Sequence, residues 1–234
     1  MPAADIIKKY VYRTLGIIVY FAAKVLAWMA NCNKKHLHLY PDMVRRIGFL
    51  FPSLDLSRVR IVKNARLPAN WFKQSKHTAG MTFGRTIFLK DGDPFDFEEI
   101  MLLIHELNHV EQMQRLGEFK FATRYGEQYK QYGYYNMPLE KEAFDFVSDI
   151  PFSPSFYLKN NEDVRIAARD SDTGAFIHWL DHGIYEKRDS TDYFNSSKYL
   201  NNYDDLLNTL GKTNDKAAIL HWIKVGKQEG RKGK

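Results

Sequence analysis

The stretch "LLIHELNHVEQ" (102–112) decides how this sequence is interpreted, because it carries the pattern His-Glu-x-x-His. On an α-helix each residue advances by about 100°, so His105 and His109 lie one turn apart with both imidazoles on the same side. Two ring nitrogens can then reach one zinc ion. Glu106 lies at the flank of that side, where its carboxylate can act as a base on a water activated by the metal. The stretch therefore predicts a zinc-binding helix with hydrolytic chemistry.

The segments around this motif predict a small sheet followed by helices. Alternating apolar residues in 54–62 are typical of a half-buried strand, and "GMTFGRTIFLKDGDP" (80–94) reads as strand and turn. Asp96, with Glu99 three residues later, predicts a helix start, and Gly117 predicts its end. Further helices are expected over 118–136 and from Pro138. The expected fold class is α+β and mostly helical.

A zinc site of this kind needs a third protein ligand, which leaves the fourth position for water. No third histidine follows at short spacing, so a carboxylate is favoured. The segment "NMPLEKEAFDF" (136–146) offers Glu140 and Glu142, and the spacing alone leaves both open.

The order of segments from about residue 41 to 146 resembles a small bacterial zincin-like domain. Its quoted features are "VRIV", "TFGRTIFLKDG", "LLIHELNHVEQ" and "YGYYNMPLEKEA". Such domains of unknown function include proteins associated with extracellular contractile injection systems. The resemblance implies a minimal zincin fold, in which a short sheet packs on an active-site helix. The edge strand of that sheet, over 82–89, could hold an extended peptide. It also implies a zinc metalloendopeptidase acting on a peptide or protein substrate.

The resemblance also bears on the third ligand and its surroundings. The helix that supplies this ligand in similar proteins reads Glu-x-x-Ala-Asp, which favours Glu140, three residues before Ala143, over Glu142. In that pattern the Asp orients a zinc-binding histidine. This chain has Phe144 at that position and Asp145 one residue later, so Asp145 is the candidate for this role. The departure keeps a second interpretation open, a zinc-binding but non-hydrolytic docking module.

An internal repeat occupies the last third of the chain. Residues 152–188 match residues 194–231 with a period of 42–43 residues. The matched pairs are Phe152/Phe194, Tyr157/Tyr199, Asp163/Asp205, His178/His221, Trp179/Trp222, Gly183/Gly226 and Arg188/Arg231. Repetition at this spacing predicts two small stacked helical units. They resemble short repeats appended to bacterial surface-polysaccharide glycosyltransferases, which implies docking of a protein partner.

Composition bounds the remaining alternatives. The net charge of +6 is not accompanied by a basic helix or an aromatic-basic motif, which disfavours nucleic-acid binding. The lone cysteine, Cys32, excludes an intramolecular disulfide and a cysteine-based zinc site. Residues 14–32 are apolar except for Lys24, and a packed or membrane-surface helix is favoured there over a membrane span or a cleaved signal. A cytoplasmic or membrane-associated protein is favoured over a secreted one.

The expected organisation has four parts. They are an apolar helix (1–35), the zincin-like metal-binding domain (36–150), helical repeat 1 (151–191) and helical repeat 2 with a basic tail (192–234).

Overall fold

The computed structural model describes residues 3–67, 79–90 and 96–234, with side chains from residue 11 onward. It divides into two compact units. Unit 1 comprises residues 1–40, 53–94 and 102–145, and unit 2 comprises residues 41–52, 95–101 and 146–234. The C-terminal unit thus recruits two segments from the middle of the chain.

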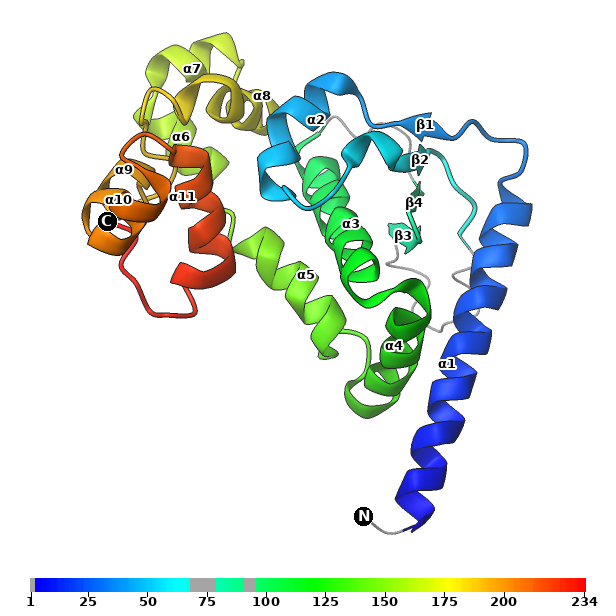
Figure 1. Ribbon diagram of the computed structural model, residues 1–234. Coiled ribbons are helices and arrows are strands. Elements are labelled where there is room, and N and C mark those ends of the chain that lie inside the picture. The colour runs from blue at the N-terminus through cyan, green and yellow to red at the C-terminus, as the bar shows by residue number, and fades with distance from the viewer. Residues whose placement is uncertain (1–2, 68–78, 91–95) are drawn as a thin grey trace. The chain divides into compact units, whose positions relative to one another are not determined.

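Unit 1 contains the strands, the longest helices and most of the predicted metal-binding segment (Figure 1). Its elements are α1 (Ala3–Ala30), β1 (Leu37–His38), a 3-10 turn η2 (Leu56–Arg58), β2 (Arg60–Val62), β3 (Gly80–Phe83), β4 (Thr86–Leu89), α3 (Phe97–Leu116), α4 (Glu118–Tyr132) and α5 (Pro138–Ser148). The first turn of α3 and the last residues of α5 belong to unit 2.

The described strands form one small mixed sheet in the order β1-β2-β4-β3. β3 and β4 are an antiparallel hairpin, and β2 runs parallel to β4 with Ile61 opposite Ile87. A small sheet in a mostly helical chain confirms the α+β class. The strand expected over 54–62 is shorter than predicted, because the Asp55 side chain accepts from the Ser57 amide and stabilises the turn η2 before β2 begins.

The helices that follow begin at the predicted signals, and one of them ends earlier than expected. The Asp96 carboxylate accepts from the Glu99 amide at 2.8 Å and caps α3. α4 ends at Tyr132, earlier than expected, because Gly133 adopts a φ of +72° that stops the helix. Pro138 is the first residue of α5.

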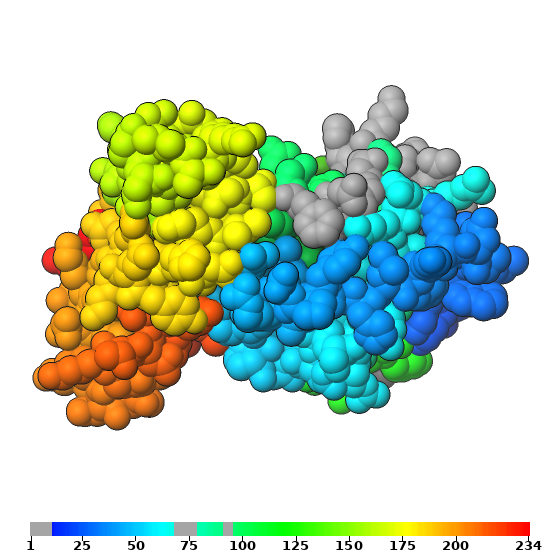
Figure 2. Space-filling model, turned by 90° about the horizontal axis from the view of Figure 1, so that it is seen from above, coloured from blue at the N-terminus to red at the C-terminus, as the bar shows by residue number. Residues whose placement is uncertain are grey.

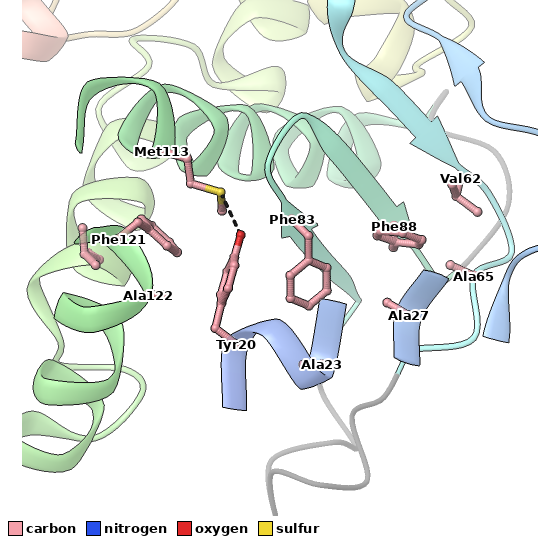
Figure 3. Packing of buried hydrophobic residues seen from close by; sticks show 11 residues of the cluster. Tyr20, Ala23, Ala27, Val62, Ala65, Phe83, Phe88, Met113, Phe121 and Ala122 are labelled. Carbon is pink, nitrogen blue, oxygen red and sulfur yellow. Dashed lines mark hydrogen bonds between the residues drawn. The ribbon is translucent and has the colours of Figure 1, made fainter. Parts of the chain in front are cut away.

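Helix α1 packs along α4 through one face. A Cβ on Gly16 would lie only 2.8 Å from the Cα of Gly126, so the two backbones are in direct contact. Lys24 donates to the Glu118 carboxylate at 2.5 Å, which pairs the one charge in the apolar run. The same face carries Tyr20, whose ring turns toward β3 and whose hydroxyl reaches the Met113 sulfur at 3.3 Å (Figure 3).

The other face of α1 is apolar and exposed. Residues Val11–Ala30 are long and apolar enough to cross a membrane by length and composition. Only a minor share of this stretch is buried, and the exposed side chains recur every three or four residues, which places them along one stripe. They include Val11, Ile18, Val25, Trp28 and Met29.

Unit 2 consists of short helices in its described residues. They are α2 (Pro41–Ile47), η1 (Gly48–Leu50), α6 (Pro154–Asn160), α7 (Glu162–Ala167), α8 (Asp172–His178), the π-helical turn η4 (Trp179–Gly183), α9 (Ser196–Asn201), α10 (Asp204–Leu210), α11 (Asp215–His221) and the π-helical turn η5 (Trp222–Gly226). The segments α6–η4 and α9–η5 lie side by side, yellow and orange in Figure 2.

The same contacts recur in these two segments. The Tyr157 hydroxyl is 2.9 Å from His178 Nδ1, and the Tyr199 hydroxyl is 2.9 Å from His221 Nδ1. Each tyrosine lies against a glycine of the following π-turn, where a Cβ would collide with the hydroxyl. The repeated His-Trp pairs are therefore packing and hydrogen-bonding residues of the helical units.

A second recurring contact is an arginine fork. Arg188 donates to both oxygens of Asp163, each at 2.8 Å. Arg231 donates to both oxygens of Asp205, at 3.0 and 2.9 Å. Each fork ties the end of its segment back to the second helix of that segment.

Two recruited segments complete unit 2. Arg45 and Arg46 of α2 both donate to the Asp181 carboxylate at 2.9 Å. Phe97, at the start of α3, packs edge-on against Phe176 with ring centroids 5.4 Å apart. These contacts explain why unit 2 includes residues from outside the C-terminal third.

Candidate metal centre

Helix α3 carries the His-Glu-x-x-His motif into the interior of unit 1. His105, Glu106 and His109 are all buried, although each has a polar side chain. The Nε2 atoms of the two histidines lie 3.2 Å apart, as expected for residues four positions apart on one helix face. Buried polar groups need partners, so the environment of these nitrogens decides what the site can hold.

The third member of the cluster is Glu140, from the first turn of α5. Its Oε2 lies 3.2 Å from His105 Nε2 and 3.3 Å from His109 Nε2, so the three atoms form a nearly equilateral triangle. A tetrahedral zinc ion with ligand distances of about 2.0–2.1 Å separates its ligand atoms by about 3.3–3.4 Å. The triangle fits one face of such a tetrahedron. These residues could hold a metal ion.

The surroundings of Glu140 Oε2 are consistent with a bound metal ion. Among the described residues it is one of the few buried side-chain atoms that lack a hydrogen-bond partner. If both facing imidazole nitrogens carry lone pairs, three electron-rich atoms meet at about 3 Å, an arrangement that needs a shared cation. A proton serves this purpose when no metal is present. Burial lowers the pKa of His109, but the Glu140 carboxylate more than offsets it and raises that pKa to about 9.

Gln112 fixes the orientation of His109. The Gln112 amide nitrogen donates to the Leu139 carbonyl at 2.9 Å, so its oxygen must be the atom 2.9 Å from His109 Nδ1. In the neutral ring, as a metal ligand requires, His109 Nδ1 therefore carries the hydrogen and Nε2 presents its lone pair to the cluster. Because Leu139 precedes Glu140, this buried glutamine connects both ligand-bearing helices.

Two tyrosines flank the Glu140 carboxylate. The Tyr125 hydroxyl donates to Glu140 Oε1 at 2.9 Å, which leaves Oε2 for the histidines. Burial and the Glu140 charge raise the pKa of Tyr125 and of Tyr134 above the ordinary value, so both phenols stay protonated donors at neutral pH. Of the other tyrosines between α3 and α5, Tyr129 lines the neighbouring cavity and Tyr135 is exposed.

Strand β3 covers the Glu106 carboxylate. Thr82 donates to Glu106 Oε2 at 2.6 Å and holds one oxygen in place. Gly80 lies two residues earlier on the same face of the strand, where a Cβ would come within 2.7 Å of Glu106 Oε1. The strand can approach the carboxylate this closely only with glycine at position 80.

A cavity of about 330 Å³ opens beside the cluster. Glu106, His109, Glu140 and Tyr134 form its polar end, so the carboxylates and the open side of the ligand triangle share one space. The rest of its described lining comes from β3, α4, α1 and Met113 of α3. The site thus has room for a bound molecule next to the candidate metal position.

The structure separates the remaining predicted residues from the cluster. Glu142 is partly exposed and accepts from Arg115 at 2.8 and 3.1 Å. Asp145 is exposed and pairs with Lys141 at 2.5 Å, whereas Phe144 packs against His105 with ring centroids 4.5 Å apart. The residue that orients a cluster histidine is instead Gln112, at the end of the stretch 102–112.

Sequence reasoning missed the site roles of Gly80 and Thr82 and could not choose Tyr125 from its neighbours. A signal for the first two exists in "GMTF" (80–83), because glycine and threonine at alternate positions lie on one face of a strand. No local pattern marks Tyr125, one of several tyrosines on its segment.

A family model described as the eCIS core domain matches residues 42–117. The match supports an association with extracellular contractile injection systems. It includes His105, Glu106 and His109, and it ends before Glu140. No curated protein and no solved structure matches the chain.

Proposed function

We propose that unit 1 is a zinc-dependent metallopeptidase whose metal is held by His105, His109 and Glu140. The observation that carries the proposal is the buried triangle of three ligand atoms at 3.2–3.3 Å, in which Glu140 Oε2 has no other hydrogen-bond partner among the described residues. Zinc bound there would lower the pKa of a coordinated water and polarise a substrate carbonyl.

Glu106 acts as the general base. Its carboxylate lies in the same cavity as His109 and Glu140, and Thr82 holds one of its oxygens at 2.6 Å. It takes a proton from the attacking water and passes that proton to the leaving amine. A purely structural metal site needs no such carboxylate, so a buried Glu106 favours hydrolysis over a metal site without hydrolytic activity.

Tyr134 is the donor for the developing oxyanion. It lines the cavity beside Glu106 and Glu140, and its raised pKa keeps the phenol protonated. The substrate backbone lies along β3, the last strand in the described sheet order, by strand addition. An extended peptide on that strand passes over Glu106, because Gly80 and Thr82 contact this carboxylate.

The second candidate is a zinc-binding docking module without hydrolysis, in which the C-terminal helical segments bind a protein partner. The observation that favours it is Phe144, which packs on His105 at the position where similar domains carry an orienting aspartate. The two candidates share the metal and differ in the role of Glu106.

Metal content tests the ligand set. Protein purified without added zinc is compared by elemental analysis with His105→Ala, Glu140→Ala and the control Glu142→Ala. About one zinc per chain is expected in the unchanged protein and in the control, and strong loss is expected in the other two variants. Zinc retained in Glu140→Ala would refute this ligand assignment.

Turnover separates the two candidates. A quenched-fluorescence peptide library is incubated with the zinc-loaded protein and with Glu106→Gln. Cleavage by the unchanged protein, lost in Glu106→Gln at equal zinc content, supports the peptidase. Zinc binding with no cleavage by either protein would support the docking module instead.

A further inference from the structure

The cavity beside the metal cluster has a polar end at Glu106, His109 and Glu140, and Lys130 is a further charged residue of its lining. Beyond Glu106 and His109 its lining is mostly apolar, with Met81 and Phe83 from β3 and Phe121 from α4. The wall opposite the strand comes from α1, through residues that include Leu15 and Val19. This helix precedes the segment matched by the family model, which begins at residue 42.

The α1 wall is held in place by several contacts to α4. Arg13 donates to Glu127 at 2.5 Å, and Lys24 donates to Glu118 at 2.5 Å, so an ion pair lies on either side of the cavity wall along the helix. Between them, the contact of Gly16 with Gly126 brings the two helices together. The wall is therefore built into unit 1.

Tyr20 holds this wall against β3 and α4. Its ring packs edge-on against Phe83 with centroids 5.3 Å apart (Figure 3). Its hydroxyl donates to Glu118 at 2.7 Å. Leu15 and Val19 lie on the cavity side and are 48% and 37% exposed, so their apolar surface is available to a ligand.

The volume and lining select the class of ligand. A volume of 330 Å³ corresponds to roughly 11 waters at about 30 Å³ each, which is enough space for one large side chain. Apolar walls favour an apolar group, whereas the polar end with Glu106, His109 and Glu140 faces the reacting bond.

We propose that α1 forms one wall of a specificity pocket that takes a single large apolar side chain, aromatic or long aliphatic, next to the bond cleaved at the zinc site. The proposal rests on the proposed function, because the metal defines where the bond lies. α1 is then part of the substrate site in addition to packing on α4.

The test compares two zinc-binding probes that are not cleaved. Acetohydroxamate carries only a methyl group, and 3-phenylpropanohydroxamate carries an aromatic ring on a short chain. Both are titrated calorimetrically into the zinc-loaded full chain. Burial of the ring is expected to make the phenyl probe bind about 10- to 100-fold more tightly.

Variants of α1 assign this preference to the wall. Val19→Trp fills the cavity and should reduce the preference to about 3-fold or less at unchanged zinc content. Ile18→Trp is the matched control, because Ile18 is 58% exposed and is not among the lining residues, and it should keep the preference. If Val19→Trp does not fold, Leu15→Trp replaces it.

Two results would overturn the proposal. One is equal affinity of the unchanged protein for both probes, and the other is an undiminished preference in Val19→Trp. If elemental analysis finds no zinc, the proposed function has failed, and the pocket is tested by NMR with N-acetylphenylalanine amide and N-acetylglycine amide. Selective shifts with the phenylalanine amide, lost in Val19→Trp, would support the pocket, and equal responses would refute it.

Discussion

Replacement of Gln112 by methionine should weaken metal binding and destabilise unit 1 together. The amide accepts from His109 Nδ1 and donates to the Leu139 carbonyl, both at 2.9 Å and both buried. Loss of the partner that orients a ligating histidine typically costs 10- to 100-fold in metal affinity, about 1.4–2.8 kcal/mol. Each buried group left unpaired costs about 1–3 kcal/mol, so metal-free Gln112→Met should lose about 2–6 kcal/mol of unfolding free energy.

A second substitution separates the two roles of this residue. Gln112→Glu keeps an acceptor for His109 and removes the donor to Leu139. Zinc affinity should then stay within a few-fold of the unchanged protein, while the metal-free fold is still destabilised by about 1–3 kcal/mol or more. Gln114→Met is the matched control, since Gln114 is exposed on the same helix and donates to the Ser53 carbonyl.

The assays are competition for zinc against a chromophoric chelator and urea unfolding in the presence of EDTA. The expected order of zinc affinity places Gln112→Met below Gln112→Glu, with Gln114→Met equal to the unchanged protein. The reasoning is refuted if Gln112→Met binds zinc as tightly as the unchanged protein, or if both Gln112 variants lose zinc equally.

Three further substitutions test other parts of the structure. Gly80→Val should lower peptide cleavage at least about 100-fold with zinc retained, because the new side chain displaces Glu106. Cleavage within a few-fold of the unchanged protein would contradict this. Gly226→Ala places a Cβ 1.9 Å from the Tyr199 hydroxyl and should cost about 1–3 kcal/mol in urea unfolding; an unchanged midpoint would show that the tyrosine moves without cost. In a flotation assay, the exposed stripe of α1 should carry the chain upward with phosphatidylglycerol vesicles, and Ile18→Lys should reduce this binding. Equal flotation of both proteins would show that the stripe does not contact lipid.

The local sequence determined the parts of this protein that depend on neighbouring residues. The spacing of His105 and His109 puts their rings on one side of a helix whatever surrounds it, and Asp96 caps that helix through an amide three residues away. The hairpin of β3 and β4 follows from two short β-rich runs with a glycine between them. These features arise over a few residues, where backbone geometry leaves little choice.

Only the tertiary structure decided how the site is completed. Glu140 and Glu142 are two residues apart on α5, so they lie on opposite sides of the helix, and the docking of α5 against α3 decides which one meets the histidines. The link from Gln112 to Leu139 and the contact of Thr82 with Glu106 join residues 24 to 27 positions apart. Sequence periodicity describes which face of an element is apolar, whereas the path of the chain decides which two faces meet. For the same reason, the sequence identified an apolar helix near the N-terminus, and only the packing of unit 1 showed that it walls the cavity beside Glu106.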